Sequence, residues 1–219
     1  MNIISVFTKE HFHSICDELA SKDDDLKAVI TMYGYPPLWS RPNTFETLVH
    51  VILEQQVSLA SALAALKKLQ KKTGSITPQN ILAMNDEELR ACYVSRQKTV
   101  YLRDLASALQ NKNLNLAALK KMPDDDIRAK LLQLKGVGNW TIDVYLMFVL
   151  KRADVFPAGD LAAVNALKRL KQLPKETSRE EMIKITKQWM PNRTIASFIL
   201  WHYYLSVAAN KKLVNAGKK

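Results

Sequence analysis

Cysteine is scarce in this sequence of 219 residues, and its scarcity excludes several classes of protein. The two cysteines, Cys16 and Cys92, are too few for a disulfide framework or a cysteine-rich zinc site. A four-cysteine iron–sulfur cluster is excluded for the same reason. The histidines form neither an HExxH motif nor a facing pair on one helix, so we do not expect a zinc hydrolase.

Long hydrophobic runs are absent as well. No apolar stretch approaches the roughly 20 residues that a membrane-spanning helix needs. The first residues are followed at once by Lys9 and Glu10, which is not the pattern of a signal peptide. We expect a cytoplasmic protein, nucleoid-associated if its source is a bacterium, with no membrane partner.

Glycine occurs only six times, and the Asn-Gly and Asp-Gly pairs that favour β-hairpins do not occur. A β-rich fold is therefore disfavoured. The charge is strongly positive, since 32 Lys and Arg stand against 21 Asp and Glu, a net charge of +11. Such a surplus is typical of proteins that bind nucleic acid, although a solvated lysine-rich surface explains it equally well.

The sequence does contain apolar spacing typical of helices. Helix start signals recur, because Asn, Ser or Pro stands before acidic residues or before an apolar stripe. We predict an all-α fold of about ten to twelve helices. The stripes are Phe45/Leu48/Val49/Ile52, Leu59/Leu63/Leu66/Leu69 and Ile195–Val207, and the start signals are Asn85, Ser95, Pro123 and Ser178.

A glycine-containing turn joins two of these helices in the segment Leu134-Lys-Gly-Val-Gly-Asn-Trp-Thr141. Gly136 can adopt the left-handed conformation that ends a helix. Gly138 leaves the backbone bare at the start of the next helix, where exposed amides bind an anion such as a phosphate. The alternative is a tight turn that binds nothing.

These residues resemble a known family. The turn, the segment Asp154-Val-Phe-Pro-Ala-Gly-Asp160 that follows it, the segment Ile52–Ser58 and the late Pro191-x-Arg193…Trp201 segment are similar to the helix-hairpin-helix (HhH-GPD) DNA glycosylases. Within them the likeness is to the 3-methyladenine DNA glycosylase II branch, from about Pro36 to Tyr203. The N-terminal β-rich domain of some relatives is not expected, because only some 35 residues precede Pro36.

The resemblance implies two helical subdomains with the hairpin and a cleft between them. We expect an N-terminal helical segment over residues 1–35, packed on the second lobe. A helical-barrel lobe would follow over residues 36–130, and the hairpin with a C-terminal helical lobe over residues 131–219.

By the same resemblance, Asp160 is the catalytic carboxylate. Its position before Leu161-Ala-Ala-Val164 is also what a helix N-cap looks like, and the two roles are compatible. Hydrolysis of an N-glycosidic bond develops positive charge on the sugar, which a fixed carboxylate stabilises while it orients or activates water. A base that already carries a positive charge leaves without a general acid, so no second catalytic carboxylate is required.

The base pocket must hold a flat cation, and aromatic faces do so by stacking and cation–π attraction. Trp201 matches the family's pocket tryptophan, and Tyr145, Trp39 and Trp140 are further candidates. Packing in the core is the alternative for Trp39 and Trp140. Val144 stands at the position where a relative has a pocket tyrosine. Tyr145 is one residue away from that position.

The resemblance also assigns residues that contact DNA. Gln56 stands at the position that fills the gap left by a flipped nucleotide, where a relative has an apolar wedge. Ser58 is a further candidate for contact with DNA, although a role as the cap of the helix that begins at Leu59 explains this serine better. The hairpin contributes Gly136, Val137, Gly138 and Thr141. Backbone carbonyls of Leu132, Leu134 and Val137 match a structural monovalent cation of the family, and catalysis requires no cofactor.

Bifunctional relatives carry a lysine in the second helix of the hairpin, and Trp140 occupies that position here. We therefore predict a monomeric, monofunctional glycosylase that removes alkylated purines, such as 3-methyladenine and 7-methylguanine, from double-stranded DNA. One alternative is a non-catalytic protein that binds DNA or senses damage. Another is a glycosylase for oxidised or mismatched bases, against which the missing lysine and cysteine cluster argue.

Overall fold

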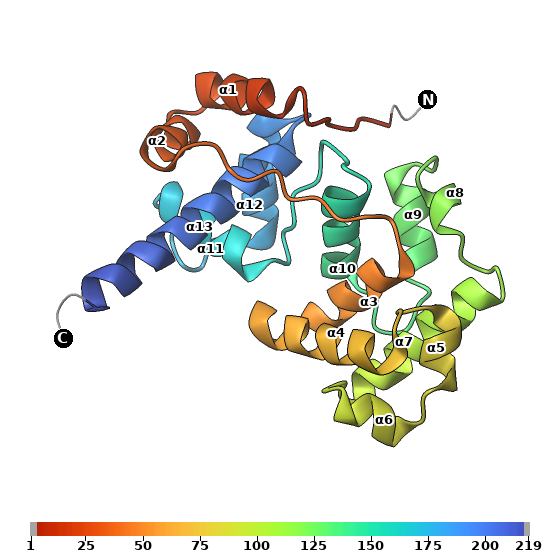
Figure 1. Ribbon diagram of the computed structural model, residues 1–219. Helices are drawn as coiled ribbons and strands as arrows, with labels where there is room; N and C mark the ends of the chain where they lie inside the picture. Colours follow the sequence, from red (N-terminus) through yellow and green to blue (C-terminus); the bar gives the residue numbers. More distant parts are fainter. Residues whose placement is uncertain (1–3, 217–219) are drawn as a thin grey trace. The chain divides into compact units, whose positions relative to one another are not determined.

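The computed structural model describes residues 4–216, and side chains as far as residue 210. Within that range the protein has thirteen α-helices and no strand, apart from an isolated bridge between Val6 and Arg152 (Figure 1). The predicted all-α class is confirmed. The helix number slightly exceeds the expected ten to twelve because short helices such as α8 (Leu116–Leu119) carry little periodicity.

The described residues divide into two compact units, and the chain passes three times between them. Unit 1 contains Arg41–Leu150 with Ile4, and unit 2 contains Ser5–Ser40 with the C-terminal part from Lys151. The hairpin residues therefore fall in unit 1, whereas the expected boundary at residue 131 groups them with the C-terminal segment.

Unit 1 is built around the buried helix α3, whose Val49, Val51, Ile52 and Leu53 are at most 2% exposed. It packs against α4, α7 and α10. The helices of unit 1 are α3 (Phe45–Glu54), α4 (Leu59–Thr73), α5 (Pro78–Ala83), α6 (Asp86–Ala91), α7 (Arg96–Gln110), α8, α9 (Asp124–Leu131) and α10 (Asn139–Val144), followed by the π-helical turn η1 (Tyr145–Val149).

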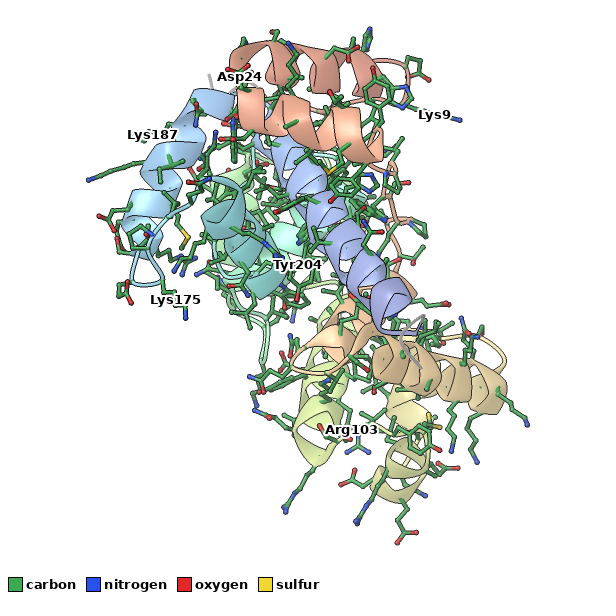
Figure 2. All side chains as sticks on the ribbon, turned by 90° about the vertical axis from the view of Figure 1, so that its left-hand side faces the viewer. Lys9, Asp24, Arg103, Lys175, Lys187 and Tyr204 are labelled. Carbon is green, nitrogen blue, oxygen red and sulfur yellow. The ribbon has the colours of Figure 1, made fainter. Side chains whose placement is uncertain are left out.

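Unit 2 is organised by its longest helix, α13, which packs against α1, α2 and α11 (Figure 1). Its buried core includes Phe198 of α13, which meets the rings of Phe7 and Phe12. Basic side chains such as Lys175 and Lys187 extend into solvent (Figure 2). The helices are α1 (Phe12–Lys22), α2 (Asp24–Tyr33), α11 (Leu161–Leu170), α12 (Arg179–Thr186), the 3-10 turn η2 (Lys187–Trp189) and α13 (Arg193–Ala216).

A buried carboxylate ties the parts of unit 2 together. Asp23 caps α2 and accepts hydrogen bonds from Lys171 Nζ at 2.7 Å and from Trp189 Nε1 at 2.8 Å. Burial opposes the charge of Asp23, but the hydrogen bonds from Lys171 and Trp189 outweigh it and lower the pKa of this carboxyl. One side chain thus links the α1–α2 junction to the end of α11 and to the turn η2.

The helix starts predicted from the polar residues Asn85, Ser95 and Ser178 are confirmed. Asn85 and Ser178 form capping boxes with Glu88 and Glu181, and Ser95 caps α7. The stripe of leucines on α4 is only half buried, however, because Leu59 is 67% and Leu63 42% exposed. None of the helices in the described part of the chain has both the length and the apolar character needed to cross a bilayer.

Candidate functional site

Asp160 stands at the start of α11 and makes two contacts through one oxygen. Its Oδ1 accepts from the backbone N–H of Ala163 at 2.9 Å, which is the N-cap interaction. The same Oδ1 accepts from the indole Nε1 of Trp201 at 2.9 Å. The two donors fix the orientation of the carboxylate, and they join it to one of the predicted pocket aromatics.

Trp201 belongs to an aromatic cluster in unit 2. The Trp39 ring meets the Trp201 ring edge-on, with centroids 6.4 Å apart, and meets Phe198 in the same way at 5.4 Å. Trp39 and Trp201 are half-buried, while Phe198 is fully buried. The cluster therefore combines the buried phenyl ring of Phe198 with two partly exposed indoles beside a carboxylate.

The segment that leads to Asp160 is fastened to the start of α13. Arg193 donates to both carboxylate oxygens of Asp154, from Nε at 2.7 Å and from Nη2 at 2.9 Å. The hydroxyl of Thr194 donates to the carbonyl of Arg152 and accepts from the N–H of Val155. These contacts fasten the segment that carries Asp160 to the helix that carries Trp201. The sequence alone indicates no role for Asp154 or Thr194.

The hairpin in unit 1 needs its first glycine more than its second. Gly136 has φ of +74°, and a Cβ there would overlap the ring of Tyr101. Gly138 is the N-cap of α10 with extended backbone, and a Cβ there would meet open space. The predicted left-handed helix end at Gly136 is confirmed, and Gly138 is sterically free to present bare backbone.

Gln55 joins the hairpin to the loop that carries Gln56. Its Nε2 donates to the carbonyl of Gly136 at 2.8 Å and to the hydroxyl of Thr141 at 2.9 Å. Thr141 is 2% exposed, so its side chain serves this contact, not an open surface. The sequence alone indicates no such role for Gln55.

The loop itself exposes Gln56. This residue has φ of +56° and an exposed side chain, while Ser58 caps α4 by accepting from the N–H of Ser61 at 3.1 Å. Lys98 holds the start of the loop, because its Nζ donates to the carbonyls of Leu53 and Gln55 at 2.7 and 2.9 Å. Burial lowers the pKa of this ammonium.

The remaining predicted residues lie in unit 1. Tyr145 is fully buried in η1, and its hydroxyl donates to Asn43 Oδ1 at 2.8 Å. Trp140 is half-buried in α10, and the carbonyl of Leu134 accepts from the N–H of Val137 at 3.2 Å. The predicted site residues thus form two groups, with Asp160, Trp201 and Trp39 in unit 2 and the others in unit 1.

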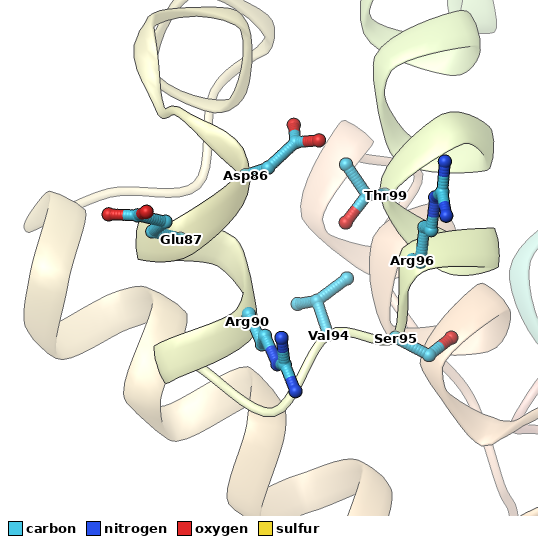
Figure 3. Close-up of a pocket in the computed structure, with 7 residues that line it drawn as sticks. All are labelled: Asp86, Glu87, Arg90, Val94, Ser95, Arg96 and Thr99. Carbon is cyan, nitrogen blue, oxygen red and sulfur yellow. The ribbon is translucent and has the colours of Figure 1, made fainter.

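A cavity of about 480 Å³ lies between α6 and α7 (Figure 3). Its walls carry both signs of charge, with Asp86 and Glu87 from α6 and Arg96 from the start of α7. Asp86 pairs with Arg103 at 2.6 Å. No aromatic side chain is among the residues that line this cavity, so it offers no stacking surface for a base.

Side-chain metal ligands do not gather in the part of the chain that the structure describes, where no three His, Cys, Asp or Glu side chains could hold a metal. Cys16 and Cys92 are free and buried. Burial raises the pKa of Cys16 to about 12.

The sequence matches a family of repair proteins over the part of the chain that holds the hairpin and Asp160. Residues 49–192, about two thirds of the chain, match the HhH-GPD superfamily of base excision DNA repair proteins. The chain belongs to this superfamily. The resemblance based on the hairpin and Asp160 is therefore confirmed at the level of the family.

Individual relatives match over a larger part of the chain. A putative DNA-3-methyladenine glycosylase of Bacillus subtilis, YfjP, is 28% identical over 201 residues, which are 88% of this chain and 69% of the relative. DNA-3-methyladenine glycosylase 1 of Schizosaccharomyces pombe is 29% identical over 206 residues, 91% of this chain and 88% of the relative.

Solved structures of this superfamily have the same fold. The Schizosaccharomyces pombe 3-methyladenine DNA glycosylase in complex with abasic DNA matches with a TM-score of 0.79 at 29% identity, over 86% of this chain and 95% of that one. A DNA-3-methyladenine glycosidase from Bacillus halodurans matches with a TM-score of 0.76 at 28% identity, over 89% of this chain and 91% of that one.

Proposed function

We propose that this protein is a monofunctional DNA glycosylase that hydrolyses the N-glycosidic bond of alkylated purines such as 3-methyladenine and 7-methylguanine. The observation that carries the proposal is the Asp160 carboxylate, held by Trp201 beside Trp39. Membership of the superfamily supports a role in base excision repair, and the relatives named above support the choice of alkylated purines.

Asp160 acts on the sugar. As the bond between sugar and base lengthens, positive charge develops on the sugar, and the ionised carboxylate stabilises that charge. The same carboxylate orients the attacking water and takes up its proton. Because the hydrogen bonds from Ala163 and Trp201 fix the carboxylate in advance, little reorganisation is needed when the charge appears.

The indoles of Trp201 and Trp39 act on the base. A purine alkylated at a ring nitrogen is a flat cation, and tryptophan is the best cation–π partner among the side chains. Such a base leaves as a neutral molecule without protonation, so the site needs no general acid. Tyr145 and Trp140 of unit 1 stay sequence-based candidates for contacts to the base.

Unit 1 binds the DNA. The backbone amides of Gly136 and Gly138, before α10, contact phosphate, and exposed Gln56 fills the gap that a flipped nucleotide leaves. A monovalent cation on the carbonyls of Leu132, Leu134 and Val137 fits these neutral oxygen donors. It would neutralise phosphate charge and take no part in the reaction.

The hairpin assignment predicts the effect of Gly138→Glu. The position has open space, so the fold tolerates a side chain, but the new charge repels phosphate. Affinity should fall by about tenfold or more, for damaged and undamaged duplexes alike. Binding titrations on both duplexes measure it, with Gly138→Ala as the uncharged control. Unchanged affinity of the Glu variant would remove the hairpin from the DNA interface.

Release of free methylated bases from alkylated duplex DNA tests the function. The wild-type protein should liberate 3-methyladenine and 7-methylguanine and leave an intact strand, which breaks only when the abasic product is heated or treated with base. Binding without release supports the alternative, a non-catalytic DNA-binding protein. Strand breakage by the protein itself would contradict the monofunctional mechanism, in which Trp140 stands in the place of a lysine nucleophile.

A further inference from the structure

One glutamine side chain bridges the two sides of the hairpin turn. Gln55 Nε2 donates both to the carbonyl of Gly136 at 2.8 Å and to the hydroxyl of Thr141 at 2.9 Å. A side-chain amide has two N–H donors, so these two contacts use its full capacity. Gly136 precedes Gly138, and Thr141 follows it in the first turn of α10. The bridge therefore spans the position at which the hairpin presents bare backbone.

The backbone of Gln55 is held as well as its side chain. Its N–H donates to the carbonyl of Ile52 at 3.3 Å, and its carbonyl accepts from Lys98 Nζ at 2.9 Å. Lys98 comes from α7, and the same Nζ also donates to the carbonyl of Leu53. Gln55 is thus fixed to α3, α7 and α10, and α3 packs directly against the other two helices (Figure 1).

The next residue leaves this framework in a strained conformation. Gln56 has φ of +56° and an exposed side chain. A left-handed backbone is uncommon for a residue other than glycine, and such strain persists where neighbouring contacts impose it. Gln55 supplies contacts of this kind, because its N–H, carbonyl and side chain are all hydrogen-bonded. The direction of the Gln56 side chain therefore depends on how Gln55 is held.

The hairpin and Gln56 are assigned to different parts of the same DNA. The hairpin contacts a phosphate, whereas Gln56 enters the base stack. A phosphate bound at the hairpin brings Gln56 to the gap only if the spacing between the two is fixed before DNA arrives. Side chains that are already held by hydrogen bonds lose little freedom on binding, which favours such an arrangement.

We propose that Gln55 is a positioning residue that couples the hairpin to Gln56, so that phosphate binding at the hairpin aligns Gln56 with the gap left by a flipped nucleotide. The inference rests on the proposed function, because it needs a nucleotide to have been flipped. Gln55 acts through its neighbours and not by touching the reacting atoms. Its loss should therefore reduce the preference for damaged DNA and leave the binding of undamaged DNA in place.

The test measures affinity for two duplexes, one undamaged and one with a stable tetrahydrofuran analogue of an abasic site. Gln55→Met keeps the length of the side chain and removes both donors. It should lower the preference for the abasic duplex about tenfold, while affinity for the undamaged duplex stays within about twofold of wild type.

The matched control is Gln70→Met. Gln70 is also half-buried in unit 1, and its Nε2 donates to Glu46 at 2.7 Å in a contact between α4 and α3 that includes neither the loop nor the hairpin. This variant should leave the preference unchanged. Thermal midpoints of both variants show what the loss of a glutamine amide costs the fold in each place.

Two further variants test the coupling itself. If Gln55 acts through Gln56, then Gln55→Met should cause no further loss of preference in protein that already carries Gln56→Ala. Thr141→Val removes one acceptor of Gln55 at a position that is 2% exposed, so it should lower the preference by about threefold without removing a surface contact.

An unchanged preference in Gln55→Met would overturn the proposal. Losses that add in the Gln55→Met, Gln56→Ala double variant would also overturn it, as would an equal loss of affinity for both duplexes, because Gln55 would then only support the fold of unit 1. Failure of the proposed function is seen separately, as wild-type protein that does not prefer the abasic duplex, and that result would remove the coupling with it.

Discussion

At the scale of single residues, Asp160 combines a structural role with the proposed catalytic one. Its Oδ1 caps α11 through Ala163 and accepts from the indole of Trp201. Capping requires an acceptor oxygen but no charge, whereas stabilising a charged sugar requires the ionised form. The two roles can therefore be separated by a substitution that keeps the oxygen and removes the charge.

The variant Trp201→Phe tests the hydrogen bond of Trp201 separately from the stacking surface of its ring. The phenyl ring keeps most of the stacking surface, but Asp160 loses the indole N–H that donates to it. A hydrogen bond to a charged group contributes about 1.5–3 kcal/mol, so the single-turnover rate of base release should fall by roughly 10- to 100-fold.

Trp39→Phe provides the control for that variant. Trp39 meets Trp201 and Phe198 through its ring, so the substitution trims the same cluster without removing the indole N–H that Asp160 accepts. Its effect on the rate should be smaller. Equal effects of the two substitutions would show that the Trp201–Asp160 hydrogen bond does not contribute to catalysis.

At the scale of elements, the two glycines of the hairpin differ in what they require. Gly136→Ala forces a left-handed φ on alanine and places its Cβ against Tyr101, so we expect a loss of stability of about 2 kcal/mol or more. Gly138→Ala should change stability by less than about 1 kcal/mol. Urea denaturation of both variants measures the difference, and equal losses would contradict the assigned backbone conformations.

The Asp23 contacts in unit 2 predict a dependence of stability on pH. Because its folded pKa is lowered, Asp23 stabilises the fold above the unfolded pKa of about 3.9, and this contribution is lost as pH falls through the folded value. Asp23→Asn should cost about 2–3 kcal/mol at pH 7, since Asp23 is buried and hydrogen-bonded to Lys171 and Trp189.

The deficit of the Asp23→Asn variant should shrink on acidification below about pH 4. Asp25→Asn is the matched control, because Asp25 pairs with the same Lys171 at 2.8 Å but its side chain is 46% exposed. That variant should lose no more than about 1 kcal/mol. A deficit of Asp23→Asn that stays constant from pH 7 to pH 2 would contradict the assigned shift.

Features encoded locally were predictable from the sequence, and long-range contacts were not. The caps at Asn85, Ser95 and Ser178 and the left-handed Gly136 follow from residues within one helical turn. Gln55 gave no signal, because its partners Gly136 and Thr141 lie 81 and 86 residues along the chain.

Helical spacing alone also cannot say whether an apolar face finds a partner. Leu59 and Leu63 continue the stripe of Leu66 and Leu69, yet only the last two are buried. Such features depend on which surfaces meet after folding.

At the scale of the whole molecule, the residues proposed for the chemistry and those proposed for DNA binding belong to different units. Unit 2 supplies Asp160 and the indoles, while unit 1 supplies the hairpin and Gln56. The net charge of +11 suits a DNA-binding protein, and affinity should fall with salt as counterions are released. DNA binding and chemistry are therefore expected to respond to different substitutions.

The most direct test compares the wild-type protein with Asp160→Asn for release of methylated bases from alkylated duplex DNA. Asparagine is as good an N-cap as aspartate, and its oxygen can still accept from Ala163 and Trp201, so the fold and DNA affinity should be retained. The account predicts that wild type releases the bases and that the variant does so at least about a hundredfold more slowly. Equal release by both proteins would contradict it and leave Asp160 as a helix cap alone.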